Sequence, residues 1–159
     1  MTMPNSRPLL AAALVASLAF AAHAADALYP EVARAKADVE SGLKQAAREH
    51  KRVLVDFGGN WCGDCKVLDI NLRKPENRAV LDKSYVLVHV NVGEKGITDN
   101  FDVAERFGIP LKKGVPAFAV LDPDGRVVYA QKNGEFESMR SMDPRSVNEF
   151  LVKWSASAR

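Results

Sequence analysis

The sequence predicts an α/β fold, with a central mixed β-sheet and helices on both of its faces. Strand and helix patterns alternate through most of the chain, and two strands joined by a turn precede a last helix, an order that favours a mixed sheet. In addition, the run 53–57 is almost continuously apolar, as expected of a strand that is covered on both faces.

The first half of this fold follows from hydrophobic spacing. A proline suits the first turn of the first helix, and the second helix must stop before Pro75, because the residue before a proline disfavours the helical conformation. Valines alternate with other residues from Tyr85 to Val92, which is the period of a strand. The elements predicted here are helices over 30–49, 62–74 and 77–81 and strands over 53–57 and 85–92.

The second half contains a predicted β-hairpin between two helices. The turn-forming tripeptide Pro123-Asp124-Gly125 separates two short apolar runs, and Asp143-Pro144 has the pattern of an N-cap followed by proline at the first helical position. The predicted elements are a helix over 100–107, strands over 117–121 and 127–130, and a helix from 143 to about 154. The last helix is expected to turn four side chains inward: Val147, Phe150, Leu151 and Trp154.

Residues 1–24 have the pattern of a signal peptide. Arg7 precedes an apolar stretch over 9–22 and a small-x-small cleavage site that ends at Ala24. A membrane anchor is the alternative, but the stretch is shorter than the roughly 20 residues that span a bilayer. Because no cysteine lies near the cleavage point, a lipoprotein anchor is excluded. We therefore expect a periplasmic or secreted protein that consists of one domain, residues 25–159.

The charge of the chain is nearly balanced, with 22 basic and 20 acidic side chains. Such a chain has no strong field that would draw it to nucleic acid or to anionic lipid. Nucleic acid is therefore not an expected partner.

Cys62 and Cys65 are the only two cysteines of the chain, and they form a Cys-Gly-Asp-Cys motif. The motif follows the strand 53–57 and the break Gly58-Gly59, so it opens a helix. The free N–H groups and partial positive charge of a helix N-terminus stabilise a thiolate. We interpret Cys62 as the nucleophile and Cys65 as the resolving thiol of a disulfide exchange site.

Two other interpretations of this pair are weaker. A structural zinc site needs four ligands, and both histidines that remain after signal-peptide removal, His50 and His89, would have to join the two thiols. An inert structural disulfide would close a very short loop, which constrains the unfolded chain little. Redox chemistry is the favoured interpretation.

With these motifs in their order, the chain resembles the thioredoxin family over nearly all of residues 25–159. The resemblance implies a thioredoxin-like fold and thiol–disulfide oxidoreductase activity on protein disulfides, with no cofactor other than the Cys62–Cys65 disulfide and no metal. The segments that carry it are Val55-Asp56-Phe57, Trp61-Cys62-Gly63-Asp64-Cys65-Lys66 and Gly114-Val115-Pro116.

The resemblance also implies roles for residues outside the cysteine pair. Asp56 matches the buried acid beneath the disulfide, which exchanges a proton with Cys65. Pro116 matches the cis-proline beside the disulfide, and it would turn the backbone of Val115 toward an extended substrate peptide. Trp61 would lie beside the exposed sulfur and contribute to the apolar rim that contacts substrate.

The chain departs from the family pattern at three places. Asp64 stands where thioredoxins have proline, and its charge should disfavour a Cys62 thiolate and so favour a reducing couple. His89 falls where thioredoxins commonly have a lysine near the buried acid, so we expect a contact with Asp56, although a histidine satisfied by the backbone fits as well. The stretch from Gly93 to Gly114 is long and could form an extra helix and loop beside the site.

The expected function is thus an exported thiol–disulfide oxidoreductase, monomeric and working in the reducing direction. In an oxidising compartment its disulfide must be reduced again, which implies a membrane electron relay as partner. Two alternatives remain: a chaperone or binding module without turnover, and a protein that handles Cu(I) through both thiols and His89.

Overall fold

The computed structural model describes residues 27–155, so the predicted signal peptide, residues 1–24, lies outside the described residues. Four strands form one mixed sheet in the order β2-β1-β3-β4. The central strand β1 pairs in parallel with β2 and antiparallel with β3, and β3 pairs antiparallel with β4. The strands are β1 (Arg52–Gly58), β2 (Tyr85–Asn91), β3 (Ala117–Leu121) and β4 (Val127–Ala130).

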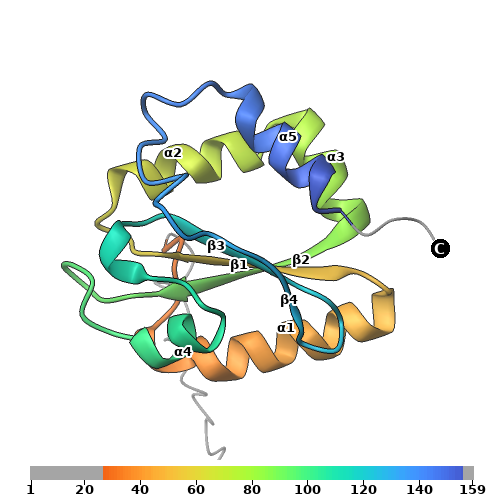
Figure 1. Ribbon diagram of the computed structural model, residues 1–159, viewed down its shortest axis with the longest axis horizontal. Coiled ribbons are helices and arrows are strands. Elements are labelled where there is room, and N and C mark those ends of the chain that lie inside the picture. The colour runs from red at the N-terminus through yellow and green to blue at the C-terminus, as the bar shows by residue number, and fades with distance from the viewer. Residues whose placement is uncertain (1–26, 156–159) are drawn as a thin grey trace, which may run out of the picture.

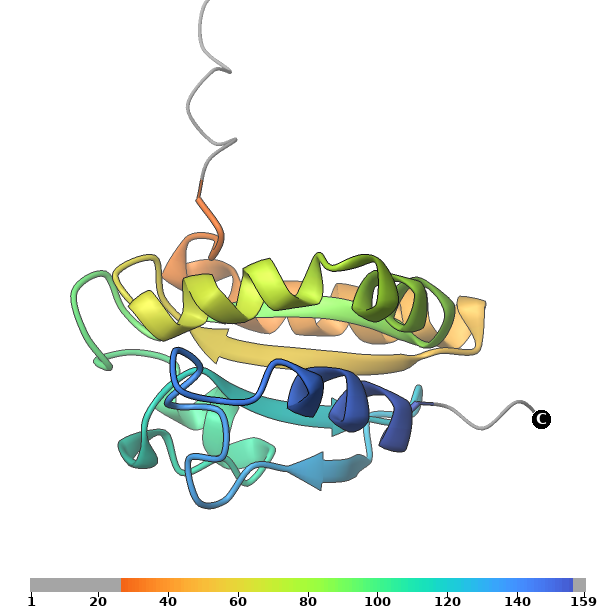
Figure 2. The ribbon, with the colours of Figure 1, turned by 90° about the horizontal axis from the view of Figure 1, so that it is seen from above.

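Helices cover both faces of this sheet, as the sequence predicts (Figures 1 and 2). One face carries α1 (Ala35–Glu49) and the short α4 (Phe101–Arg106). The other face carries α2 (Gly63–Leu72), α3 (Pro75–Ser84) and α5 (Arg145–Lys153). Two 3₁₀ turns complete the described elements, η1 (Val32–Arg34) and η2 (Leu111–Lys113). Within residues 27–155, every helix is too short or too polar to cross a membrane.

Successive side chains of β1 point alternately into two apolar clusters, one on each face of the sheet. Val53, Val55 and Phe57 pack in the cluster that includes the buried residues of α1 and α4, whereas Leu54 packs in the cluster of α2, α3 and α5. The alternating valines of β2 also behave as predicted, because those at 86, 88 and 90 all lie in the first cluster. The middle of the sheet is therefore covered on both faces.

Several predicted boundaries differ from the observed ones, including the end of the second helix, which falls at Leu72 rather than at 74. The first helix begins at Ala35 rather than at Pro30, because the chain makes the 3₁₀ turn η1 after the proline. The helix predicted over 77–81 is α3, which is longer and begins at Pro75, since a proline without an N–H group is well placed in the first turn. The strand predicted to Val92 ends at Asn91.

The hairpin and the last helix follow the prediction more closely. Strands β3 and β4 have the predicted bounds, and Gly125 in their turn has a φ of +84°, a conformation that favours glycine. The Asp143 carboxylate accepts the backbone N–H of Arg145 at 2.9 Å, but the N-cap of α5 is Pro144, one residue later than predicted. Trp154 does point inward, but it is half-buried against Tyr129 and packs on the edge of the second apolar cluster.

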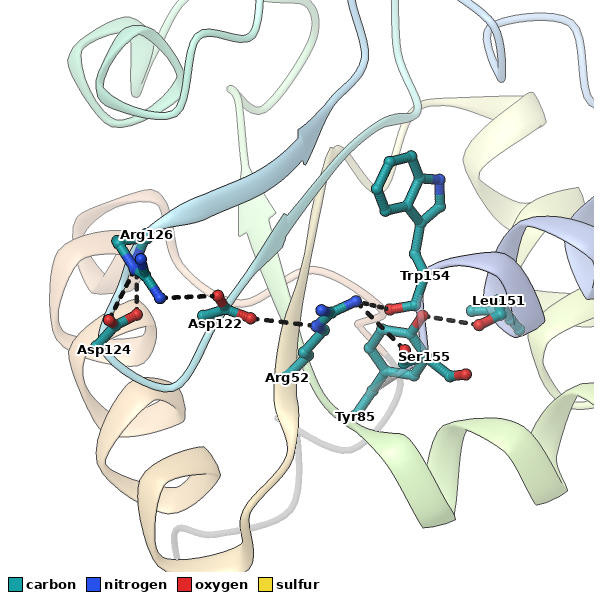
Figure 3. A network of polar contacts seen from close by, with 8 residues as sticks. All are labelled: Arg52, Tyr85, Asp122, Asp124, Arg126, Leu151, Trp154 and Ser155. Atoms are coloured by element: carbon teal, nitrogen blue, oxygen red, sulfur yellow. Dashed lines mark hydrogen bonds and ion pairs between the residues drawn. The ribbon is translucent and has the colours of Figure 1, made fainter. Parts of the chain in front are cut away.

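A polar network at the start of β1 joins four parts of the chain (Figure 3). The Arg52 guanidinium donates to Asp122, in the β3–β4 turn, at 3.2 Å and to the carbonyl oxygen of Trp154 at 2.8 Å. Tyr85 donates to the carbonyl oxygen of Leu151 at 2.8 Å. This network lies at one end of β1 and the cysteines follow the other end, so it stabilises the fold and leaves the site free.

Candidate active site

The two cysteines lie where β1 passes into α2. Cys62 is the N-cap of α2 and forms a disulfide with Cys65, whose backbone N–H lies 3.1 Å from the Cys62 Sγ. This helix N-terminus therefore points at the sulfur that is expected to react. The Cys62 residue is only 5 % exposed, so its sulfur is less accessible than the sequence-based picture of an exposed nucleophile supposed.

The loop before β3 lies against this disulfide. The Val115–Pro116 peptide bond is cis, and the carbonyl oxygen of Val115 lies 3.8 Å from the Cys62 Sγ. Buried Gln131 holds the loop in place, because its side-chain amide donates to the carbonyl oxygen of Pro116 and its side-chain oxygen accepts the N–H of Phe118, both at 3.2 Å. Sequence reasoning missed Gln131, which directly follows the predicted β4 and carries no motif.

Asp56 is a buried acid, 1 % exposed, near the end of β1 that leads to the cysteines. Its Oδ2 lies 2.9 Å from Nδ1 of His89, its direct partner on β2, so the predicted contact between the two side chains is present. The same Oδ2 accepts the Tyr29 hydroxyl at 2.7 Å. Among residues 27–155, the buried Oδ1 has no hydrogen-bond partner. Only one of the two carboxyl oxygens is thus hydrogen-bonded within the described residues.

Tyr29 is the second residue that sequence reasoning missed. It precedes the first helix and is separated from Asp56 by 27 positions, so no motif connects the two. Its ring packs edge-on against His89 with centroids 5.1 Å apart. Burial, followed by the charge of Asp56, raises the pKa of Tyr29 well above its ordinary value. The hydroxyl therefore stays protonated and acts as a donor to Asp56.

Gly58 has no side chain, which lets Tyr29 and Cys65 both pack closely against its backbone. A methyl group on Gly58 would collide with the Tyr29 hydroxyl and would lie 2.8 Å from the Cys65 Sγ. We expect Gly58→Ala to lower the free energy of unfolding by about 1–3 kcal/mol, because both neighbours are buried and must shift. Urea unfolding measures this change. The matched control is Gly96→Ala, since a Cβ there meets open space among the described residues, and a loss as large in the control would contradict the explanation.

Trp61 connects the site to the long stretch that follows β2. The indole is 38 % exposed, as expected of a rim residue, and its Nε1–H donates to the carbonyl oxygen of Gly93 at 2.7 Å. The stretch from Gly93 to Gly114 contains the short helix α4 and the 3₁₀ turn η2. Its first residue is thus fixed to the rim of the site.

Asp64, between the cysteines, is paired with Arg140. The Arg140 Nε lies 3.2 Å from both carboxylate oxygens and Nη2 lies 2.9 Å from Oδ2, while the backbone N–H of Arg140 donates to Oδ1 at 2.9 Å. The sequence predicts an isolated charge at Asp64, but a guanidinium 76 positions downstream offsets it. No local pattern near Asp64 identifies this partner.

The described part of the chain holds no group of three His, Cys, Asp or Glu side chains arranged for a metal ion. His89, the third ligand in the Cu(I) alternative, is instead paired with Asp56. The geometry therefore gives that alternative no support.

A mixed sheet between helices, with a disulfide at a helix N-terminus and a cis-proline loop against it, defines a class of thiol–disulfide exchange proteins. The family model described as "Thioredoxin-like" matches residues 34–123. The chain belongs to the thioredoxin-like family.

Individual relatives agree with this assignment. The chain is 30% identical over 105 residues to a thioredoxin of Buchnera aphidicola, a match that covers 65% of this chain and 86% of the relative. A crystal structure of a disulphide isomerase from Xylella fastidiosa is similar with 35% identity and a TM-score of 0.75, over 82% of this chain and 98% of that one. The oxidised DsbD C-terminal domain of Neisseria meningitidis is 18% identical, with a TM-score of 0.51 over 74% of this chain and 95% of its own. This similarity shows the fold alone. The family and the Cys62–Cys65 disulfide support oxidoreductase activity.

Proposed function

We propose that this protein reduces disulfides of protein substrates through its Cys-Gly-Asp-Cys site. The observation that carries the proposal is the buried, half-unpartnered Asp56 in the same small cluster as Tyr29 and the resolving cysteine. An inert disulfide has no use for a buried acid, because an incompletely hydrogen-bonded carboxyl group in the core costs stability. In an exchange reaction, the same carboxyl group can accept the proton of the resolving cysteine.

The reaction begins with the reduced protein. The Cys62 thiolate attacks one sulfur of the substrate disulfide, so that a Cys62–substrate disulfide forms and the other substrate sulfur leaves as a thiolate. Cys65 then transfers its proton to Asp56 and attacks the Cys62 sulfur, which releases the second substrate thiolate. Two electrons pass to the substrate, and the Cys62–Cys65 disulfide remains. His89, at the edge strand and partly exposed, would pass the proton of Asp56 on to solvent.

The charge around Cys62 favours the reducing direction. A strong oxidant needs a strongly stabilised thiolate, whereas here the carboxylate of Asp64 offsets the guanidinium of Arg140. A reducing couple is therefore still expected, because the two charges cancel and leave the Cys62 thiolate without extra stabilisation. The similarity to a thioredoxin supports the same direction.

Disulfide isomerisation is a second candidate, favoured by the 35% identical relative, which is described as a disulphide isomerase. Isomerisation begins with the same attack by the Cys62 thiolate but ends when a substrate thiol, rather than Cys65, displaces Cys62. Reduction needs Cys65 in every turnover, so the two activities separate in a Cys65→Ser variant.

We infer an exported, monomeric protein that is reduced by a membrane electron relay. The signal-peptide pattern of residues 1–24 supports export to the periplasm or beyond. A reductase in an oxidising compartment needs an electron donor of this kind, because no soluble thiol pool is present there. Val115, whose carbonyl oxygen lies 3.8 Å from the Cys62 Sγ, would contact the substrate peptide together with Pro116 and the exposed Trp61.

The first experiment is the reduction potential of the Cys62–Cys65 couple, measured on residues 25–159 in glutathione buffers with alkylation of free thiols as readout. We expect a value near about −270 mV, which is the range of thioredoxin. A value near about −120 mV, the range of strong oxidants, would reverse the proposed direction.

A further inference from the structure

Arg140 lies over the dipeptide between the two cysteines, at a place that the proposed exchange steps do not use. Its Cζ and Nη1 lie 4.0 Å from the point where a side chain on Gly63 would begin. Gly63 directly follows Cys62, so the guanidinium lies against the residue next to the expected nucleophile. The Asp64 carboxylate receives three N–H donors of Arg140, two from the guanidinium and one from the backbone.

The segment that carries Arg140 is anchored independently of this ion pair. The neighbouring Met139 is 3 % exposed and Phe136 is 5 % exposed, and both lie in the same apolar cluster as Leu68 and Leu72 of α2. Loss of the guanidinium therefore removes a charge without releasing the segment from the helix. The effect of Arg140 on the cysteines is then mainly electrostatic.

Few other charges face this part of the site. On α2, Lys66 is exposed and follows the second cysteine. Asp56, with Tyr29 and His89, lies in the buried cluster at the end of β1. From the segment that follows β4, the Glu137 carboxylate lies against Gly114 in the cis-proline loop. The balance between Asp64 and Arg140 is therefore the charge feature closest in the chain to Cys62.

We propose that Arg140 tunes the redox equilibrium of Cys62 by offsetting the charge of Asp64. When both partners are present, the charges of Asp64 and Arg140 nearly cancel, so the thiolate is stabilised mainly by the helix N-terminus. With Asp64 alone the thiolate is destabilised, and with Arg140 alone it is stabilised. This inference rests on the proposed function, because it takes Cys62 as the reacting thiol.

The pair keeps its charges at every pH at which thiols exchange. The side-chain hydrogen bonds from Arg140 hold the pKa of Asp64 below its ordinary value of 3.8, and the carboxylate in turn raises the pKa of Arg140. A lowered carboxyl pKa means that the pair is intact above the ordinary value and is lost only as the pH falls through the lowered one. The tuning is thus constant through the neutral range.

Two single variants test the proposal because they predict shifts of opposite sign. Arg140→Gln should raise the pKa of the Cys62 thiol. It should also shift the equilibrium constant with glutathione about threefold to tenfold, in the direction of a more reducing Cys62–Cys65 couple. Asp64→Asn should lower the thiol pKa and make the constant more oxidising by a similar factor. Asparagine keeps an oxygen for the backbone N–H of Arg140. The double variant should lie within about twofold of the wild type.

Thiolate absorbance against pH gives the thiol pKa, and alkylation in glutathione buffers gives the equilibrium constant. The matched control is Arg145→Gln, which breaks the bidentate Arg145–Asp143 pair farther along the same chain segment. The Arg145→Gln variant should change neither the thiol pKa nor the equilibrium constant with glutathione. If Arg140→Gln and Asp64→Asn shift the equilibrium in the same direction, or neither shifts it, the pair is only a tether and the proposal is wrong.

These outcomes are separate from a failure of the proposed function. If wild-type protein does not exchange with glutathione through Cys62, the exchange activity itself is refuted. If the wild type exchanges and the variants behave like it, only the role of Arg140 is refuted.

Discussion

Replacement of Cys62 by serine is expected to lower the rate of protein-disulfide reduction by about 10³-fold or more, because a serine hydroxyl is a far weaker nucleophile than a thiolate at neutral pH. The measurement is the reduction of a disulfide-bonded protein such as insulin, with dithiothreitol as the terminal reductant. Cys62 caps α2 in the structure, and a serine is also a good N-cap, so the variant should fold.

The matched variant is Cys65→Ser, which leaves the nucleophile in place. It should attack substrate once and then accumulate as a mixed disulfide through Cys62, visible as an added mass that dithiothreitol removes. Isomerase activity on a scrambled protein should persist in this variant if isomerisation is the function, and be lost if reduction is. A Cys62→Ser variant that matches the wild type in every activity would instead favour the chaperone alternative.

Replacement of Asp56 by asparagine is expected to slow the second step by about 10²-fold at neutral pH, the lower end of general acid–base contributions. An amide cannot accept the proton of Cys65, which must then leave directly to solvent or hydroxide. The deficit should therefore shrink as the pH rises from about 6 to about 9. Rapid mixing of the reduced protein with a fluorescent disulfide substrate measures release of the second thiol.

The structure indicates that this variant retains its fold. Asparagine has nearly the volume of aspartate and can still accept the Tyr29 hydroxyl through its side-chain oxygen. Tyr29→Phe is the matched control, because it removes one hydrogen bond to Asp56 and leaves the carboxylate able to take a proton. A smaller deficit in Tyr29→Phe is expected. An Asp56→Asn variant with the wild-type rate at every pH would show that Asp56 is only structural.

Sequence reasoning reached the fold because its strongest signals are local. The apolar run of β1, the alternating valines of β2 and the turn at Pro123-Asp124-Gly125 each specify an element without reference to the rest of the chain. The boundary errors at Pro30 and Pro75 have a local cause too, since proline permits either a turn or a helix start there. The half-buried position of Trp154 depends on Tyr129 and could not be predicted from its own helix.

The residues of the site also fall into two groups, those that the sequence indicates and those that only the tertiary structure reveals. By itself, the sequence determined the cysteine pair at a helix N-terminus, because it is a short motif that follows a recognisable strand. The resemblance to the thioredoxin family, which rests on equally short motifs, added Asp56 and Pro116. Only the tertiary structure could bring in Tyr29, Gln131 and Arg140, which lie in segments far along the chain and carry no pattern of their own. The physical reason is that hydrogen bonds and ion pairs depend on distance in space, whereas periodicity reports only on neighbours along the chain.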